Sequence, residues 1–477
     1  MLNATIELMD LQQPGYKANV NAASSAATEL MSSYLDAGKD FIDYWNMFSG
    51  GLNPFLTMAS GTLAYQKQSI EWGNRYVHEM TKDIPRMQFG LGHKLLDRDH
   101  CWNILEVDEH PDYPQAGENG SIVITVPFMR GPALADYGNH EKSSITRQAM
   151  RHGFKPYIVH SREGCTENKF CTHADYRASG RWALQRVKEQ GETPHLANIC
   201  ASGYKFTIAV AEDMKEKKDR YVATERNIND LLGAENHAQE VPHTEIDSLV
   251  KSITNVGVPW HVSRDSPIRK AADCIPDDVI QQTLQDNDYR TDGRLTAFFW
   301  KVFTLEHAMD YLMLSDLGFL NATHDPGYDP SKNDTFRSWL EEDYFDLPGT
   351  LHAELATTVF KQGRLPELFG PILGYMDLPI VCMTGENDDI SWPKDCRAMA
   401  DDVGTNPEQI FILEKQGAGH SGIYISKKSV STEYPNEWMR MENGFQKAAD
   451  GSWQDIFRIL KTLPEADIGV IGEKAYK

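Results

Sequence analysis

Three reactive side chains, a thiol, a carboxylate and an imidazole, occur in that order along the chain, each shortly after a short apolar run. They belong to Cys200, Asp388 and His420. A thiol is a weak nucleophile at neutral pH unless an imidazole accepts its proton, and an acid holds the imidazole in the required tautomer. The residue types and their order therefore predict a catalytic triad in which Cys200 is the nucleophile.

The residues around Cys200 are small, as a sharp turn requires. Ala201, Ser202 and Gly203 follow the cysteine, and a helix-like segment comes next. A strained turn between a strand and a helix exposes a nucleophile, and only small neighbours fit beside it. Asn198 and Ser202 stand where the usual Gly-x-nucleophile-x-Gly pattern has glycines. A buried structural cysteine is therefore the alternative interpretation of Cys200 taken alone.

Two loops that contain glycine carry the acid and the histidine. Asp388 lies in Gly-Glu-Asn-Asp-Asp-Ile-Ser at 385–391, and we choose it as the orienting acid over Asp389. A solvated turn carboxylate is the alternative for either aspartate. His420 lies in Gly-Ala-Gly-His-Ser-Gly at 417–422, where the glycines allow a close approach. The order nucleophile, acid, histidine is typical of α/β-hydrolases.

Backbone N–H groups would bind the oxyanion in such a fold. One belongs to Ala201, the residue after the nucleophile. The other comes from the loop after an early strand, and we assign it to Phe128 or Met129 in Pro-Phe-Met-Arg-Gly at 127–131. The alternative for Phe128 and Met129 is a place in the core at the end of a strand.

Short apolar runs bounded by Gly, Pro or polar residues predict the strands that position these residues. Helix-like segments separate the first three runs, which is typical of βαβ units and a parallel sheet. The runs lie at 121–126, 156–160, 195–199, 379–384 and 409–413. The predicted fold class is α/β, with an α/β-hydrolase-like, mostly parallel sheet flanked by helices, a helical lid insertion and a helical N-terminal arm.

The same pattern divides the chain into four parts. Residues 1–114 are predicted to form a helical N-terminal arm that packs on the main domain, with docking to an apolar surface as the alternative. Residues 115–225 and 376–477 are predicted to form the two parts of the α/β core. Residues 226–375 show no clear series of strands, so we predict a mainly helical lid or insertion there.

The overall composition excludes several classes of function. Of the 477 residues, 47 are Lys or Arg and 69 are Asp or Glu, which gives a formal net charge of −22. This charge repels phosphate backbones, so nucleic acid is not an expected partner. No apolar stretch reaches the roughly 18 residues of a spanning helix, and the N-terminus does not read as a signal peptide. We expect a cytoplasmic chain without a transmembrane segment.

The seven cysteines are scattered singly along the chain, with no CxxC pair and no spacing typical of zinc ligands. This spacing argues against a disulfide framework and against structural zinc. We therefore expect no metal and no organic cofactor.

Four segments carry a resemblance to a known family: 200–203, 346–349, 385–391 and 417–424. They resemble the polyhydroxyalkanoate synthases and intracellular polyhydroxybutyrate depolymerases, a group of α/β-hydrolases. The resemblance covers about 120–215 and 340–430. The Asp-Asp-Ile-Ser and Gly-x-Gly-His-x-Gly segments are more similar to the depolymerases. The resemblance implies a Cys-Asp-His triad, here Cys200, Asp388 and His420.

The expected function is that of a cytoplasmic acyl hydrolase that cleaves polyhydroxyalkanoate esters through an acyl-cysteine. Its partners would be a polyester or hydroxyacyl ester substrate and the surface of a polyhydroxyalkanoate granule. One alternative is a polyhydroxyalkanoate synthase that transfers hydroxyacyl groups from CoA. A second alternative is a non-catalytic, granule-associated protein that retains the hydrolase fold.

Overall fold

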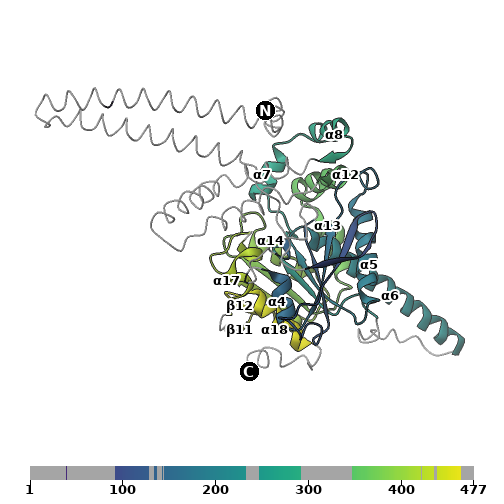
Figure 1. Cartoon of the computed structure of the whole chain (residues 1–477). Helices are drawn as coiled ribbons and strands as arrows, with labels where there is room; N and C mark the ends of the chain where they lie inside the picture. Colours follow the sequence, from purple (N-terminus) through teal and green to yellow (C-terminus); the bar gives the residue numbers. More distant parts are fainter. Residues whose placement is uncertain are drawn as a thin grey trace, which may run out of the picture. The chain divides into compact units, whose positions relative to one another are not determined.

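The computed structural model describes residues 39, 92–127, 134–136, 142, 144–232, 247–291, 346–420, 422–433 and 438–463. The chain divides into two compact units, Met1–Pro85 with Leu305–Asp334, and Arg86–Thr304 with Thr335–Lys477. Every described residue except Lys39 belongs to the second unit. The fold and the sites below therefore concern that unit (Figure 1).

Ten strands form one sheet in the part of the chain that the structure describes. They are β1 (His93–Arg98), β2 (Trp102–Val107), β3 (Ser121–Thr125), β4 (Lys155–Ser161), β5 (His195–Ile199), β6 (Ile253–Val256), β9 (Ile380–Gly385), β10 (Ile410–Lys415), β11 (Trp438–Arg440) and β12 (Gln446–Ala449). Their order in the sheet is β1-β2-β4-β3-β5-β6-β9-β10-β12-β11. The strands from β4 to β12 in this order run parallel, and β1, β2 and β11 are antiparallel to their neighbours.

Helices connect the strands and cover the sheet. They are α4 (Ile145–Arg151), α5 (His173–Lys188), α6 (Ser202–Leu232), α7 (Pro267–Asp273), α8 (Asp277–Asp286), α12 (Gly349–Glu354), the π-helix η4 (Leu355–Lys361), α13 (Leu365–Leu373), α14 (Pro393–Arg397), α15 (Met399–Asp402), the 3₁₀ turn η5 (Pro407–Gln409), α16 (Gly422–Ile425), α17 (Lys427–Val430) and α18 (Trp453–Thr462). The two-residue strands β7 (Arg290–Thr291) and β8 (Leu347–Pro348) pair separately. In Figure 1 the large sheet lies between the α5–α6 pair and the group of α4, α17 and α18.

The central strands are buried along their whole length because both faces of the sheet are covered. All residues of β5, β6 and β9 are buried. This continuous burial is typical of parallel strands between two helix layers. It confirms the predicted α/β class, with a mostly parallel sheet flanked by helices.

The register of the central strands brings their carboxyl ends to one edge of the sheet. Ile199 pairs with Val256, Val256 with Met383, and Met383 with Leu413. Loops that leave β5, β6, β9 and β10 therefore start side by side. Ligands and catalytic groups of open α/β sheets collect at this edge.

Two predicted segments differ from the structure. Residues 92–107, predicted as part of the helical arm, form the antiparallel pair β1 and β2. Trp102 and Ile104 of β2 are buried whereas Asn103 between them is less so, which is the two-residue period of a strand. The rest of the predicted arm lies outside the described residues, apart from Lys39 and residues 108–114, which form a turn-rich connection.

The predicted lid at 226–375 also contains a core strand. β6 lies in the centre of the sheet, between β5 and β9. It is four residues long and includes Thr254 and Asn255, so it lacks the apolar run by which β3, β4, β5, β9 and β10 were predicted. The other described residues of this segment are mainly helical, and residues 233–246 and 292–345 lie outside the described part of the chain.

Candidate active site

Cys200 occupies a strained turn between β5 and α6. Only Cys200 and Ala201 separate the end of the strand from the start of the helix. The φ angle of Cys200 is 52°, in the left-handed region that residues with a Cβ rarely adopt. Its N–H donates to the Val256 carbonyl at 2.9 Å, and its carbonyl accepts from Gly203 N–H at 3.0 Å. This geometry is that of a nucleophile elbow.

Buried polar side chains occupy the two positions where the usual elbow has glycines. Asn198 and Ser202 are fully buried. Thr125 Oγ1 donates to Asn198 Oδ1 at 2.8 Å and lies 2.9 Å from Ser202 Oγ. Asn198 Nδ2 donates to Asn255 Oδ1 at 2.9 Å. Hydrogen bonds between neighbouring strands thus hold the elbow, and they satisfy polar groups that would be costly to bury alone.

The glycine that the elbow does require is Gly203. A Cβ at this position would lie 2.3 Å from Cγ2 of Val258 and 3.1 Å from Cβ of Asn198. The first turn of α6 therefore packs too closely on the residues after β6 for any side chain at position 203.

The structure brings Cys200, His420 and Asp388 together. His420 Nε2 lies 3.3 Å from Cys200 Sγ, and His420 Nδ1 lies 2.8 Å from Asp388 Oδ2. Cys200 and His420 are each 8% exposed and Asp388 is 2% exposed. The imidazole thus connects a thiol to a carboxylate, which is the arrangement in which histidine can accept and return a proton.

A tight turn fixes the Asp388 carboxylate. Its Oδ1 accepts the backbone N–H groups of Ile390 at 3.1 Å and Ser391 at 2.8 Å. Its second oxygen, Oδ2, is therefore available to form the hydrogen bond with His420. Asp389, the neighbouring candidate, is only half-buried.

The charges around His420 favour its protonated form. Burial by itself would lower the pKa of the imidazole, but the Asp388 carboxylate and the Cys200 sulfur outweigh burial and raise the pKa well above its usual value. Other buried histidines behave in the opposite way, since burial lowers the pKa of His195 to about 3 and that of His160 to about 4. An imidazolium beside a sulfur stabilises the thiolate, which is the nucleophilic form.

Tyr424 is a site residue that the sequence analysis did not single out. Its hydroxyl lies 3.2 Å from His420 Nε2 and donates to the Val256 carbonyl at 3.3 Å. Burial raises the pKa of Tyr424, so the phenol keeps its proton. Because that proton is directed to Val256, the phenol oxygen can accept Nε2–H of a protonated His420. The available signal was its place four residues after the histidine, in the segment 417–424.

Gly257 makes room for this tyrosine. Its φ is 59°, and a Cβ there would lie 2.2 Å from the Tyr424 hydroxyl oxygen. Gly257 directly follows β6, the strand that the sequence did not reveal.

Lys205 is a second residue without a predicted role. It lies one turn into α6 and is almost fully buried, with Nζ 5.2 Å from the ring centre of Tyr204 and 5.6 Å from that of Tyr176. Burial lowers its pKa well below the usual value for lysine. Burial thus favours the neutral amine, which the two rings surround on α5 and α6.

The predicted oxyanion donors are described only in part. Ala201 follows Cys200 directly and is buried. Phe128 and Met129 lie outside the described residues. The assignment of the second donor therefore stays a prediction.

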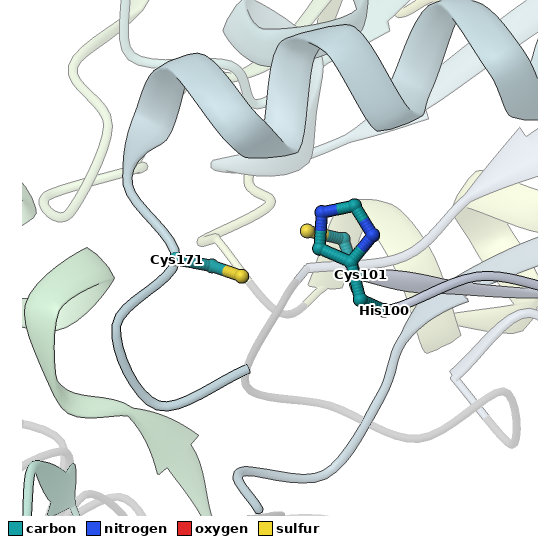
Figure 2. A group of neighbouring side chains, drawn as sticks. All are labelled: His100, Cys101 and Cys171. Carbon is teal, nitrogen blue, oxygen red and sulfur yellow. The ribbon is translucent and has the colours of Figure 1, made fainter. Parts of the chain in front are cut away.

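One group in the described part of the chain has the residue types and spacing of a metal site. His100, Cys101 and Cys171 offer ligand atoms that all lie within 4.8 Å of one another (Figure 2). None of these residues was predicted to bind a metal.

No family model matches the chain, and no curated protein matches it. Among solved structures it is similar to a soluble variant of monoglyceride lipase from Saccharomyces cerevisiae, with 10% identity over 72% of this chain and 91% of that chain and a TM-score of 0.37. It is also similar to a thermophilic esterase from Thermogutta terrifontis, with 11% identity over 64% of this chain and 84% of that chain and a TM-score of 0.35. A third similar structure is the thioesterase domain from the curacin biosynthetic pathway, with 10% identity over 70% of this chain and 95% of that chain and a TM-score of 0.33. At these identities the likenesses carry no information about substrate or reaction.

In the described residues, no helix has the length and apolar character needed to cross a membrane.

Proposed function

We propose that the chain is an acyl hydrolase that cleaves polyhydroxyalkanoate-type esters through an acyl-cysteine on Cys200. The observation that supports this most is the pair of contacts made by one imidazole, Nε2 to Cys200 Sγ at 3.3 Å and Nδ1 to Asp388 Oδ2 at 2.8 Å. The strained φ of Cys200 at the end of a buried strand adds to it. Structural cysteines have no need of either feature.

In the first half of the reaction, the Cys200 thiol gives its proton to His420 Nε2 and the sulfur attacks the ester carbonyl carbon. The oxyanion that forms accepts the Ala201 N–H and a second backbone donor. When the ester C–O bond breaks, Nε2–H passes its proton to the leaving alkoxide oxygen. An alcohol leaves, and the acyl group stays on Sγ as a thioester.

In the second half, water replaces the alcohol. His420 Nε2 takes a proton from the water as the water oxygen attacks the thioester carbonyl carbon. The C–S bond then breaks, the acid leaves, and the sulfur recovers its proton from Nε2. Asp388 stabilises the imidazolium in both halves, and the Tyr424 oxygen offers Nε2–H a second acceptor.

The substrate class in this proposal rests on the resemblance of 385–391 and 417–424 to intracellular depolymerases. The substrate would be a polyester of hydroxy acids, met at the surface of a granule. The proposed hydrolysis itself rests on the site geometry and does not depend on that substrate.

The test uses the purified full-length chain with amorphous polyhydroxybutyrate granules and, in parallel, with 3-hydroxybutyryl-CoA. We expect release of hydroxy acid by the wild type and by the Cys274→Ser variant, which lacks an exposed cysteine outside the site. Cys200→Ala should release none. Intact-protein mass spectrometry of a quenched reaction should show an acyl adduct that maps to Cys200.

Other outcomes would replace the proposal. Release of CoA with polymer formation, dependent on Cys200, would make the chain a synthase with the same acyl-cysteine. If the chain hydrolyses simple esters but not granules, and the hydrolysis depends on Cys200, the acyl-cysteine mechanism would stand and the polyester substrate would be rejected. No activity on any ester, with slow alkylation of Cys200, would identify a non-catalytic protein that keeps the fold.

A further inference from the structure

We propose that His100, Cys101 and Cys171, here called the Cys101 cluster, bind a zinc ion. This inference goes beyond the proposed hydrolysis, because none of the three residues belongs to the triad. Two of them lie in the turn between β1 and β2, and the third lies just before α5 (Figure 2).

The distances in the cluster are close to those that zinc requires. One ligand atom from each residue lies within 4.8 Å of the others. With Zn–S bonds of about 2.3 Å and Zn–N bonds of about 2.0 Å, two ligands of a tetrahedral ion are roughly 3.5 to 4 Å apart. The ligand atoms would therefore have to approach one another by about an ångström to hold the ion.

Hydrogen bonds hold the turn that carries His100 and Cys101. Asp99 Oδ1 accepts the backbone N–H groups of Cys101 and Trp102, both at 2.8 Å. On the other side, Arg162 N–H donates to the Cys101 carbonyl at 2.8 Å. The arrangement is thus built before a ligand arrives, which lowers the entropic cost of binding.

The third ligand is fixed independently. Cys171 N–H donates to the Asn168 carbonyl at 2.9 Å, and Thr172, the next residue, caps the N-terminus of α5. The indole N–H of Trp102 donates to the Tyr176 carbonyl at 3.0 Å and ties α5 to β2. A metal ion in the cluster would therefore link two elements that already contact each other.

The donor set suits zinc. Two thiolates and one neutral imidazole with Zn²⁺ give a site without net charge, which burial tolerates. Cys101 and Cys171 are buried, whereas the His100 side chain is 52% exposed and provides the path of entry. Three protein ligands leave the fourth position for water on that exposed side.

The Asp99 carboxylate completes the arrangement. Its Oδ2 accepts a hydrogen bond from the Ser179 hydroxyl and lies 3.8 Å from His100 Nδ1. A carboxylate beside a metal-binding imidazole orients the ring and strengthens it as a ligand. The expectation of no zinc site came from spacing alone, and ligands brought together from a turn and a distant helix start have no spacing signature.

The test is cobalt and zinc titration of the full-length chain in the Cys200→Ser background, so that the triad thiol cannot contribute. We expect one Co²⁺ per chain, with thiolate-to-cobalt charge-transfer bands and the visible bands of tetrahedral cobalt, and displacement by one Zn²⁺. Adding His100→Ala, an exposed position that the fold does not need, should weaken zinc binding by more than about tenfold. Cys171→Ser should abolish the charge-transfer bands, and Cys165→Ser should leave them unchanged.

Three results would overturn the proposal. One is zinc affinity that is the same with and without His100 and Cys171. Another is no stoichiometric binding to a chain whose circular dichroism shows that it is folded. The third is a Cys101–Cys171 disulfide, found by mass spectrometry after purification without reductant, in a protein that takes up no metal when reduced.

Discussion

Two groupings of thiol, imidazole and carboxylate lie in the same unit, and they differ in where the imidazole stands. At the triad, His420 lies between the sulfur and the carboxylate, 3.3 Å from one and 2.8 Å from the other. In the Cys101 cluster, His100 stands beside two sulfurs, with Nδ1 3.8 Å from the Asp99 carboxylate. The first imidazole is buried and the second is largely exposed.

The two carboxylates are held in the same way. Asp388 Oδ1 accepts the N–H groups of the second and third residues after it, and so does Asp99 Oδ1. The difference lies in the other oxygen, which bonds His420 at the triad and the Ser179 hydroxyl at the cluster. The same local turn thus lies beside a buried imidazole that contacts a thiol in one place and carries one cysteine of the Cys101 cluster in the other.

The largest expected effect is on ester hydrolysis, which should depend on Cys200 of the triad and not on Cys171 of the Cys101 cluster. Cys200→Ala should lower kcat/KM for ester hydrolysis by at least about 10³-fold, because the nucleophile is lost. Cys171→Ala should change it by less than about twofold, since independent sites do not couple. Steady-state rates of ester hydrolysis by both folded variants measure this. A large loss of kcat/KM in Cys171→Ala would show that the Cys101 cluster is not independent of the triad.

The next effect tests the carboxylate that contacts the imidazole. Asp388→Asn should lower kcat by about 10²- to 10⁴-fold. It also removes the charge that raises the pKa of His420, so burial would then lower that pKa, and the alkaline limb of the pH profile should move to lower pH. Asp389→Asn is the matched control and should leave both the rate and the limb in place. An unchanged limb in Asp388→Asn would contradict the assignment.

A smaller effect concerns what holds the triad cysteine. Asn198→Ala removes a fully buried side chain that bonds Thr125 and Asn255. The unfolding free energy should fall by about 2 kcal/mol, because its partners lose their hydrogen bonds in the core. Urea denaturation followed by circular dichroism measures this. The double variant with Asn255→Ala should lose less than the sum of the two single losses, and strict additivity would argue against the network.

Tyr424→Phe tests the second acceptor at His420 Nε2. Loss of one hydrogen bond to a charged group should lower kcat by about tenfold, with KM nearly unchanged. Rates for Tyr424→Phe and for the remote control Tyr375→Phe give the comparison. Equal rates for the wild type and Tyr424→Phe would show that the phenol only fills space.

The smallest effect is expected from removing metal. Treatment with a chelator should change kcat/KM by less than about twofold, since the Cys101 cluster takes no part in the chemistry. Zinc should raise the unfolding temperature of the wild type, because it binds the folded chain, and should not raise that of Cys171→Ser. Calorimetric scans with zinc and with chelator measure this, and equal zinc effects on both proteins would locate the metal elsewhere.

Residues that follow a single recognisable strand can be predicted from the sequence, whereas contacts that depend on the packing of several strands cannot. That Cys200, Asp388 and His420 lie together could be predicted, because each follows its own strand and parallel strands end at one edge of the sheet. Tyr424 could not, because its hydroxyl reaches the site only where Gly257 leaves room. That glycine follows β6, whose four residues include Thr254 and Asn255 and give no apolar run.

The Cys101 cluster and the elbow illustrate the same limit. Cys101 and Cys171 are far apart in sequence, and they meet only because α5 packs on β2. Asn198 looked like a departure from the elbow pattern because its partners, Thr125 and Asn255, come from the two flanking strands. Contacts between side chains of neighbouring strands cannot be predicted from any one segment of the chain.

Because Gly257 and Tyr424 approach closely, the order in which these two residues are substituted during evolution matters. Any side chain at 257 would meet the tyrosine hydroxyl oxygen at 2.2 Å, so it is excluded while the tyrosine is present. A lineage could replace the tyrosine first and the glycine afterwards, although the end of the Ile423 side chain, 2.9 Å from the new Cβ, would also have to shift and the φ of 59° would be strained. The reverse path would pass through an overpacked intermediate. The two positions are therefore epistatic, and surviving relatives should contain the glycine wherever they contain the tyrosine.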